Sequence, residues 1–136
     1  MEGSKREKIK RLTEMGREVF DEESGKTLEE RLEVAREVVE GIDERGDDRL
    51  STPEWYKRDV LLGAKVIDWC RADYLKEGME EELAAEKGYL AGKVVVDGLK
   101  KFREEGGLDV YKEWYLDHDE SGNPKFVTTK RRRKRD

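Results

Sequence analysis

The segment from Trp55 to about Leu75 constrains the fold of this chain most, because it is apolar on nearly every side of a helix. Its polar residues form only a narrow stripe: Glu54, Arg58, Lys65 and Asp68. A helix of this kind needs neighbours on most of its sides to keep it from water. We therefore expect it at the centre of a helical bundle, with Thr52 as its N-cap and Pro53 at its first helical position.

Two amphipathic segments precede this helix and have apolar residues at steps of three and four, which is typical of surface helices. The first is expected from about Ser4 to Phe20, and the second from Thr27 to about Gly41. Thr27 and Glu30 have the spacing of a capping box, in which each side chain binds the backbone of the other residue. The short loop between the two segments predicts a helical hairpin.

A fourth helix is expected from about Met79 to Glu105, with a row of small residues at steps of four: Ala84, Gly88 and Gly92. Each glycine inside a helix costs about 1 kcal/mol relative to alanine, so the row indicates close approach of another helix. That helix is either the third helix of the same chain or the fourth helix of a second subunit. Residues 93–97 also fit a strand, but the apolar stripe of the helix continues through Leu99 to Phe102.

After Gly106 and Gly107, which should end the fourth helix, aromatic and β-branched residues flank a Gly-Asn-Pro turn. This pattern predicts a short hairpin, or a helical turn followed by an extended arm. Only 35% of the 136 residues are hydrophobic and 46% are charged, which would also fit disorder if the apolar residues lacked helical spacing. We therefore predict a mainly α fold, a compact bundle of about four helices with this hairpin or arm and a basic tail.

The expected organisation is a single helical domain over residues 1–129, followed by a basic tail over residues 130–136. Within the domain we expect a helical hairpin (1–49), core helices (50–106) and the C-terminal hairpin or arm (107–129). The chain has no Gln and one Asn, which is typical of a thermophilic source. No apolar run has the length of a membrane span and the start lacks a hydrophobic signal core, so we expect a cytoplasmic protein.

Three motifs that suggest chemistry have simpler interpretations. Asp117, Asp119, Ser121 and Gly122 match the opening of a calcium loop, but Thr128 stands where the bidentate Glu is needed. A turn in which the Asp and Ser side chains cap their own backbone explains the same residues. Cys70 and His118 are the only residues of their kinds and are expected on different elements, so a buried structural Cys is favoured over a nucleophile.

Residues 24–27 end like a phosphate-binding loop but lack its upstream glycine, so we interpret them as a capped loop. We expect no catalytic residues, no metal and no cofactor. Catalysis by Asp and Glu side chains alone is the third-ranked alternative, which would need carboxylates converging in a pocket.

Charge is sorted along the chain. Residues 1–11 carry +3 and residues 130–136 carry +5, whereas the whole chain carries −5, so residues 12–129 carry −13. An acidic body repels phosphates, so contacts with nucleic acid should be made by the ends. The expected contact residues are Lys5, Arg6, Lys8, Lys10, Arg11, Lys130, Arg131, Arg132, Arg133, Lys134 and Arg135.

These patterns predict a small helical accessory protein, cellular or viral, that binds nucleic acid non-specifically by phosphate contacts. It would form a homo-oligomer through the row of Ala84, Gly88 and Gly92, and it would not bind membranes. The alternative is a protein-interaction module, such as a structural subunit, adaptor or inhibitor, whose acidic body binds a basic protein. The tail would then be a solvated segment, or would pair with acidic protein surfaces.

Overall fold

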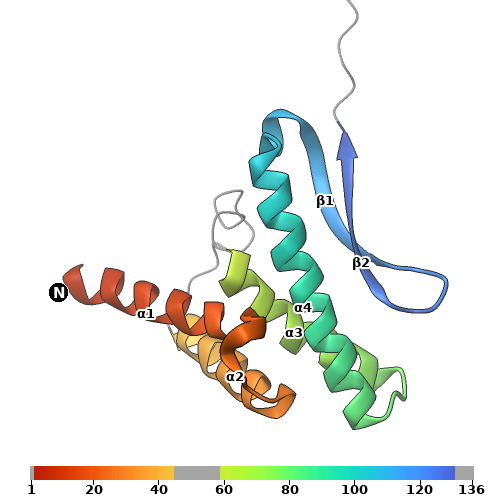
Figure 1. Cartoon of the computed structure of the whole chain (residues 1–136), viewed down its shortest axis with the longest axis horizontal. Helices are drawn as coiled ribbons and strands as arrows, with labels where there is room; N and C mark the ends of the chain where they lie inside the picture. Colours follow the sequence, from red (N-terminus) through yellow and green to blue (C-terminus); the bar gives the residue numbers. More distant parts are fainter. Residues whose placement is uncertain (1, 45–58, 131–136) are drawn as a thin grey trace, which may run out of the picture.

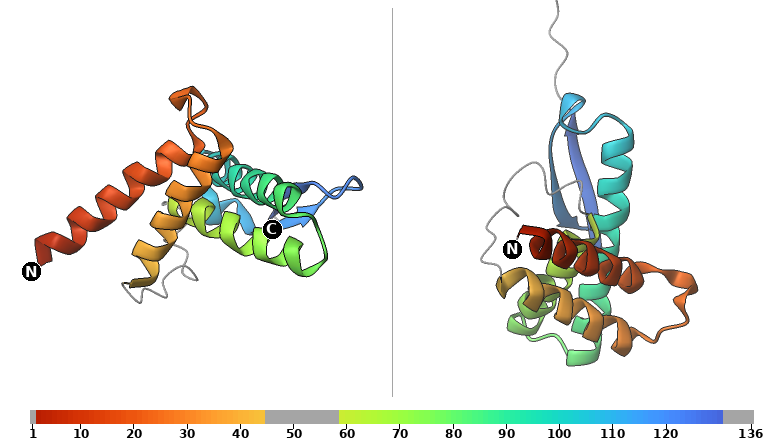
Figure 2. Two further views of the ribbon diagram at one scale, coloured as in Figure 1. Left: turned by 90° about the horizontal axis from the view of Figure 1, so that it is seen from below. Right: turned by 90° about the vertical axis from the view of Figure 1, so that its left-hand side faces the viewer.

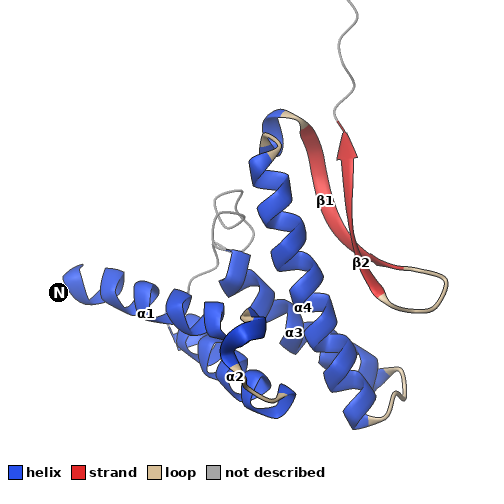
Figure 3. Ribbon diagram, viewed as in Figure 1, coloured by secondary structure: helices blue, strands red, loops and turns tan. Residues whose placement is uncertain are grey.

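The computed structural model describes residues 2–44 and 59–130, and it confirms a mainly helical bundle with a C-terminal hairpin (Figures 1 and 3). The expected start of the central helix at Thr52 and Pro53 lies outside the described residues. In chain order the elements are α1 (Glu2–Phe20), the 3-10 turn η1 (Glu22–Ser24), α2 (Leu28–Glu44), α3 (Asp59–Lys76), α4 (Glu81–Glu104), the 3-10 turn η4 (Gly107–Asp109), β1 (Tyr111–His118) and β2 (Pro124–Lys130).

α1 and α2 pack on each other as the predicted helical hairpin (Figure 1). The capping box is confirmed, because the Glu30 amide donates to Thr27 Oγ1 at 3.2 Å and the Thr27 amide donates to Glu30 Oε1 at 3.1 Å. The hydrogen bonds from the backbone and side chain of Thr27 hold the pKa of the Glu30 carboxyl below its usual value. Arg31, one residue further on, donates to Tyr89 Oη at 2.8 Å and to the Val19 carbonyl at 3.3 Å. The start of α2 is therefore fixed to α1 and α4.

α3 lies between two apolar clusters, which explains why its sequence is apolar on most sides. Its residues Leu61, Ala64 and Ile67 pack with the buried faces of α1 and α2. Leu62 and Val66 point into a second cluster with α4, on which the hairpin also packs. The prediction of a central helix is thus confirmed. One aromatic residue departs from it, since Trp69 is 49% exposed.

α4 is an unbroken helix through residues 93–97, so the helical alternative is confirmed over the strand. The small residues face α3 of the same chain. A Cβ on Gly92 would overlap the Ile67 side chain and lie 2.7 Å from the Gly63 carbonyl oxygen, and a Cβ on Gly88 would lie 3.0 Å from the Ile67 carbonyl oxygen. The glycines therefore allow the two helices to approach closely.

The chain leaves α4 through Gly106 and Gly107, whose φ angles of 114° and 55° are left-handed. This confirms the predicted helix stop. β1 and β2 then form an antiparallel hairpin that lies along α4, with Trp114 opposite Thr128 (Figures 1 and 2). The Trp114 and Phe126 rings stack with centroids 5.3 Å apart, and both pack against the cluster between α3 and α4. The hairpin alternative is thus confirmed over the extended arm.

The hairpin approaches α4 closely at Gly98, where a side chain would overlap the Phe126 ring. Within residues 2–44 and 59–130, none of the helices combines the length and apolar character needed to cross a bilayer.

Candidate nucleic-acid interface

The basic tail begins at a cluster of lysines. β2 ends at Lys130, which pairs with Tyr111 across the hairpin, and Lys112 follows Tyr111 at an irregularity of the register. Lys101, near the end of α4, lines one pocket together with Tyr111 and Thr128. All three lysines are exposed, and we call Lys101, Lys112 and Lys130 the cationic rim. Figure 1 shows that this end of the hairpin lies beside the C-terminal end of α4.

The rest of the predicted tail site, Arg131, Arg132, Arg133, Lys134 and Arg135, lies outside the described residues. It follows Lys130 directly in the chain, so its starting point in space is the cationic rim. The sequence indicated the tail but not the rim, because Lys101 and Lys112 are separated from the tail in sequence and join it only through the hairpin.

The second predicted basic region is on α1. Lys10 and Arg11 are exposed and Lys8 is half-buried, whereas the side chains of Lys5 and Arg6 are outside the described part of the chain. Figures 1 and 2 show the N-terminal half of α1 projecting from the bundle, away from the hairpin. The structure therefore does not bring the two predicted basic regions side by side, and they would bind phosphates as separate sites.

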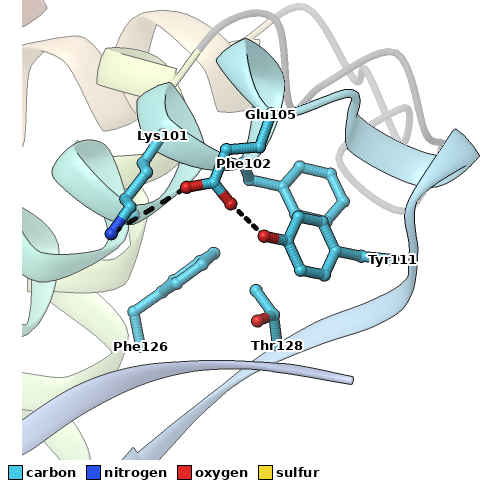
Figure 4. A pocket seen from close by; sticks show the side chains of 7 residues that line it. Lys101, Phe102, Glu105, Tyr111, Phe126 and Thr128 are labelled. Carbon is cyan, nitrogen blue, oxygen red and sulfur yellow. Dashed lines mark hydrogen bonds and ion pairs between the residues drawn. The ribbon is translucent and has the colours of Figure 1, made fainter. Parts of the chain in front are cut away.

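A pocket of about 180 Å³ lies between the end of α4 and the hairpin, next to the cationic rim (Figure 4). We call it the hairpin pocket, and its lining residues are Gly98, Lys101, Phe102, Glu105, Tyr111, Phe126 and Thr128. The Phe102 and Tyr111 rings stack with centroids 5.3 Å apart, and the Phe126 ring and Thr128 reach the pocket from β2.

The polar groups of the hairpin pocket form a chain. The Tyr111 hydroxyl donates to Glu105 Oε2, and Lys101 Nζ lies 3.9 Å from Glu105 Oε1. The bond to Glu105 raises the pKa of the Tyr111 hydroxyl, with burial and the carboxylate charge adding to the effect. The pocket thus offers an ammonium group, a carboxylate and hydroxyls beside aromatic walls.

Sequence reasoning missed the hairpin pocket. Lys101 and Glu105 have the spacing of an ion pair on one helix face, which is a common surface pattern. The other walls come from β1 and β2, and only the docking of the hairpin on α4 brings them together.

His118 binds the bundle and not Cys70. Its Nε2 atom lies 2.7 Å from the Tyr74 hydroxyl oxygen of α3, and the two rings meet edge to face. Burial, followed by the neighbouring Cys70 and Glu77, raises the pKa of Tyr74 to about 12. Tyr74 is only 5% exposed, so this contact attaches the turn end of β1 to α3. We interpret the pair as a structural contact.

Burial, with a smaller contribution from Asp73, raises the pKa of the Cys70 thiol to about 11. Because the thiolate is the reactive form, we expect Cys70 in the folded protein to react with iodoacetamide at least tenfold more slowly at pH 8 than in the urea-unfolded chain. The rate in the folded protein should still rise between pH 9 and about 11, where the unfolded chain has levelled off. Mass spectrometry of the alkylated chain measures both rates, and equal rates at pH 8 would contradict the assignment.

The calcium-like residues form a capped turn. Asp119 Oδ1 accepts hydrogen bonds from the amides of Ser121 and Asn123, both at 2.9 Å, and Asp117 Oδ1 accepts from the His118 amide at 2.8 Å. These oxygens bind the backbone of their own turn, as the simpler interpretation predicted. In the described residues, no three His, Cys, Asp or Glu side chains are grouped to hold a metal ion.

The row predicted as a subunit interface, Ala84, Gly88 and Gly92, is buried against α3 within one chain. Of the two partners that the sequence allowed, the structure therefore shows the third helix of the same chain. The row cannot also be covered by a second subunit, because α3 fills the space that the glycines leave.

Comparison of the chain with protein-family models, with curated proteins and with solved structures found no match.

Proposed function

We propose that this chain is a small, non-enzymatic accessory protein that associates with nucleic acid through phosphate contacts of its basic ends. One observation carries the proposal: the basic tail starts at Lys130, where Lys101 and Lys112 are also exposed. Cations from α4, β1 and β2 thus adjoin a run of five further Lys and Arg residues. Such a cluster binds phosphates without reading sequence and makes affinity strongly dependent on salt.

The acidic character of the rest of the chain supports a one-sided contact. Residues 12–129 carry a net charge of −13, so phosphates are attracted only where the lysines and arginines gather. A homo-oligomer is not required for this activity, because one chain carries both the rim and the tail. Composition also leads us to propose a cytoplasmic protein of a thermophilic cell or of its viruses.

An electrophoretic shift assay with labelled DNA at about 50 mM and about 200 mM salt tests the proposal. The full chain should bind at the lower salt and weaken steeply at the higher one. A chain ending at Thr129, which lacks Lys130 and the tail, should bind about tenfold more weakly, because each lost phosphate contact lowers the salt slope by about 0.9.

The matched control for this assay replaces Glu29, Glu33 and Glu37 by Gln, and it should bind DNA at least as well as the full chain. These three side chains of α2 are exposed and far from the tail in sequence. Equal binding by the full and shortened chains would remove the tail from the proposal. Failure of the full chain to bind DNA or RNA at either salt would overturn it.

The second candidate function is capture of a basic protein. The observation that favours it is the exposure of Glu29, Glu33 and Glu37, which are spaced at one helical turn along α2. Polylysine can serve as the probe. If this function holds, the Gln variant should lose polylysine binding while the chain ending at Thr129 keeps it.

A further inference from the structure

We propose that the hairpin pocket receives one unpaired pyrimidine base of a single strand whose phosphates lie on the cationic rim. This inference rests on the proposed function and adds to it a class of ligand, single strands over duplexes. The argument uses the size of the pocket, the chemistry of its walls and its position.

The volume of the hairpin pocket fits one six-membered ring. It measures about 180 Å³, and an apolar cavity of about 150 Å³ in another protein holds benzene. A pyrimidine is such a ring with small substituents, whereas the two fused rings of a purine need more space. The pocket is also partly open to the surface, so a base can enter it without unfolding the hairpin.

The walls of the hairpin pocket combine ring faces with polar groups. Aromatic rings are the usual surface on which unpaired bases stack, and here Phe102, Tyr111 and Phe126 supply them. Lys101 can donate to a carbonyl oxygen of the base, and the Glu105 carboxylate can accept from a ring N–H. Uracil and thymine carry both groups on one edge. Figure 4 shows Lys101 and Glu105 on one side of the space, with Phe126 and Thr128 facing them.

The position of the pocket links base and phosphate contacts. Tyr111 is a pocket residue and pairs with Lys130, and Lys112 follows it in β1. A strand with one base in the pocket would therefore place neighbouring phosphates near the cationic rim and the start of the tail. Bases of a duplex are stacked and paired, so a duplex can use the rim but not the pocket.

The first test compares ligands that differ only in their bases. Fluorescence anisotropy at about 50 mM salt measures binding of a labelled oligothymidine, of an abasic strand with the same number of phosphates, and of a duplex of the same length. We expect the oligothymidine to bind about tenfold more tightly than the abasic strand, since stacking of one base contributes about 1–3 kcal/mol.

The second test fills the pocket. Thr128→Leu places a larger side chain in the hairpin pocket and should lower the oligothymidine affinity to that of the abasic strand. Thr129→Leu is the matched control, because the next residue of a strand points to the other face of the sheet. It should keep the full preference. Circular dichroism of both variants checks that they fold.

The outcomes separate this inference from the proposed function. If the abasic strand binds as tightly as oligothymidine to the unaltered protein, phosphate binding stands and the pocket has no role. If only Thr128→Leu misfolds, this comparison on the unaltered chain still decides. If none of the three ligands binds, both proposals fail.

Discussion

Replacing Phe102 by Ala should lower the free energy of unfolding by about 4 kcal/mol. The Phe102 side chain is only 2% exposed and its ring stacks on Tyr111 with centroids 5.3 Å apart. Its loss removes buried apolar surface and leaves a void that opens into the hairpin pocket, and α4 cannot close this void while the hairpin holds its other side. Urea unfolding followed by circular dichroism measures the change.

The control for this prediction is Tyr115→Ala. Tyr115 is also an aromatic residue of the C-terminal region, on β1, but it is 45% exposed. The control should cost less than about 1 kcal/mol, because most of the ring is already in water. Equal losses for the two variants would show that Phe102 does not fix the hairpin to the bundle.

Replacing Gly92 by Ala should cost about 2 kcal/mol of unfolding free energy, although alanine is the better helix former by about 1 kcal/mol. The new methyl group would overlap Ile67 and lie 2.7 Å from the Gly63 carbonyl oxygen. A side chain can rotate away, but a carbonyl inside α3 can move only with its helix. We therefore expect the packing of α3 on α4 to loosen, with a loss of stability in urea unfolding.

Two variants of α4 calibrate this result. Gly88→Ala places its methyl group 3.0 Å from the Ile67 carbonyl oxygen, a milder approach, and should cost less than Gly92→Ala. Lys100→Ala changes an exposed residue and should stay within about 0.5 kcal/mol of the original protein. A stabilising effect of Gly92→Ala would mean that helix propensity outweighs the contact with α3.

The sequence predicted features whose causes are local. The capping box of Thr27 and Glu30 spans three residues, so its two hydrogen bonds depend only on the start of one helix. The stop at Gly106 and Gly107 depends on left-handed φ angles that glycine adopts at little cost. The capped turn at Asp119 is likewise made within five residues.

The apolar pattern of the central helix also determined its place, because a helix that is apolar on most sides must be covered on most sides. The same pattern could not tell which helix would fill the groove at Gly92. A second subunit and α3 offer the same kind of surface, and the choice depends on how the chain turns back between α3 and α4.

The candidate site divides in the same way. Sequence alone determined that the two ends of the chain are basic and the body acidic, because charge is a sum over residues. Tertiary structure decided that Lys101, Lys112 and Lys130 gather where the tail starts, and that Phe102, Tyr111 and Phe126 enclose a pocket beside them. These residues come from three elements, and only the packing of the hairpin on α4 makes them neighbours.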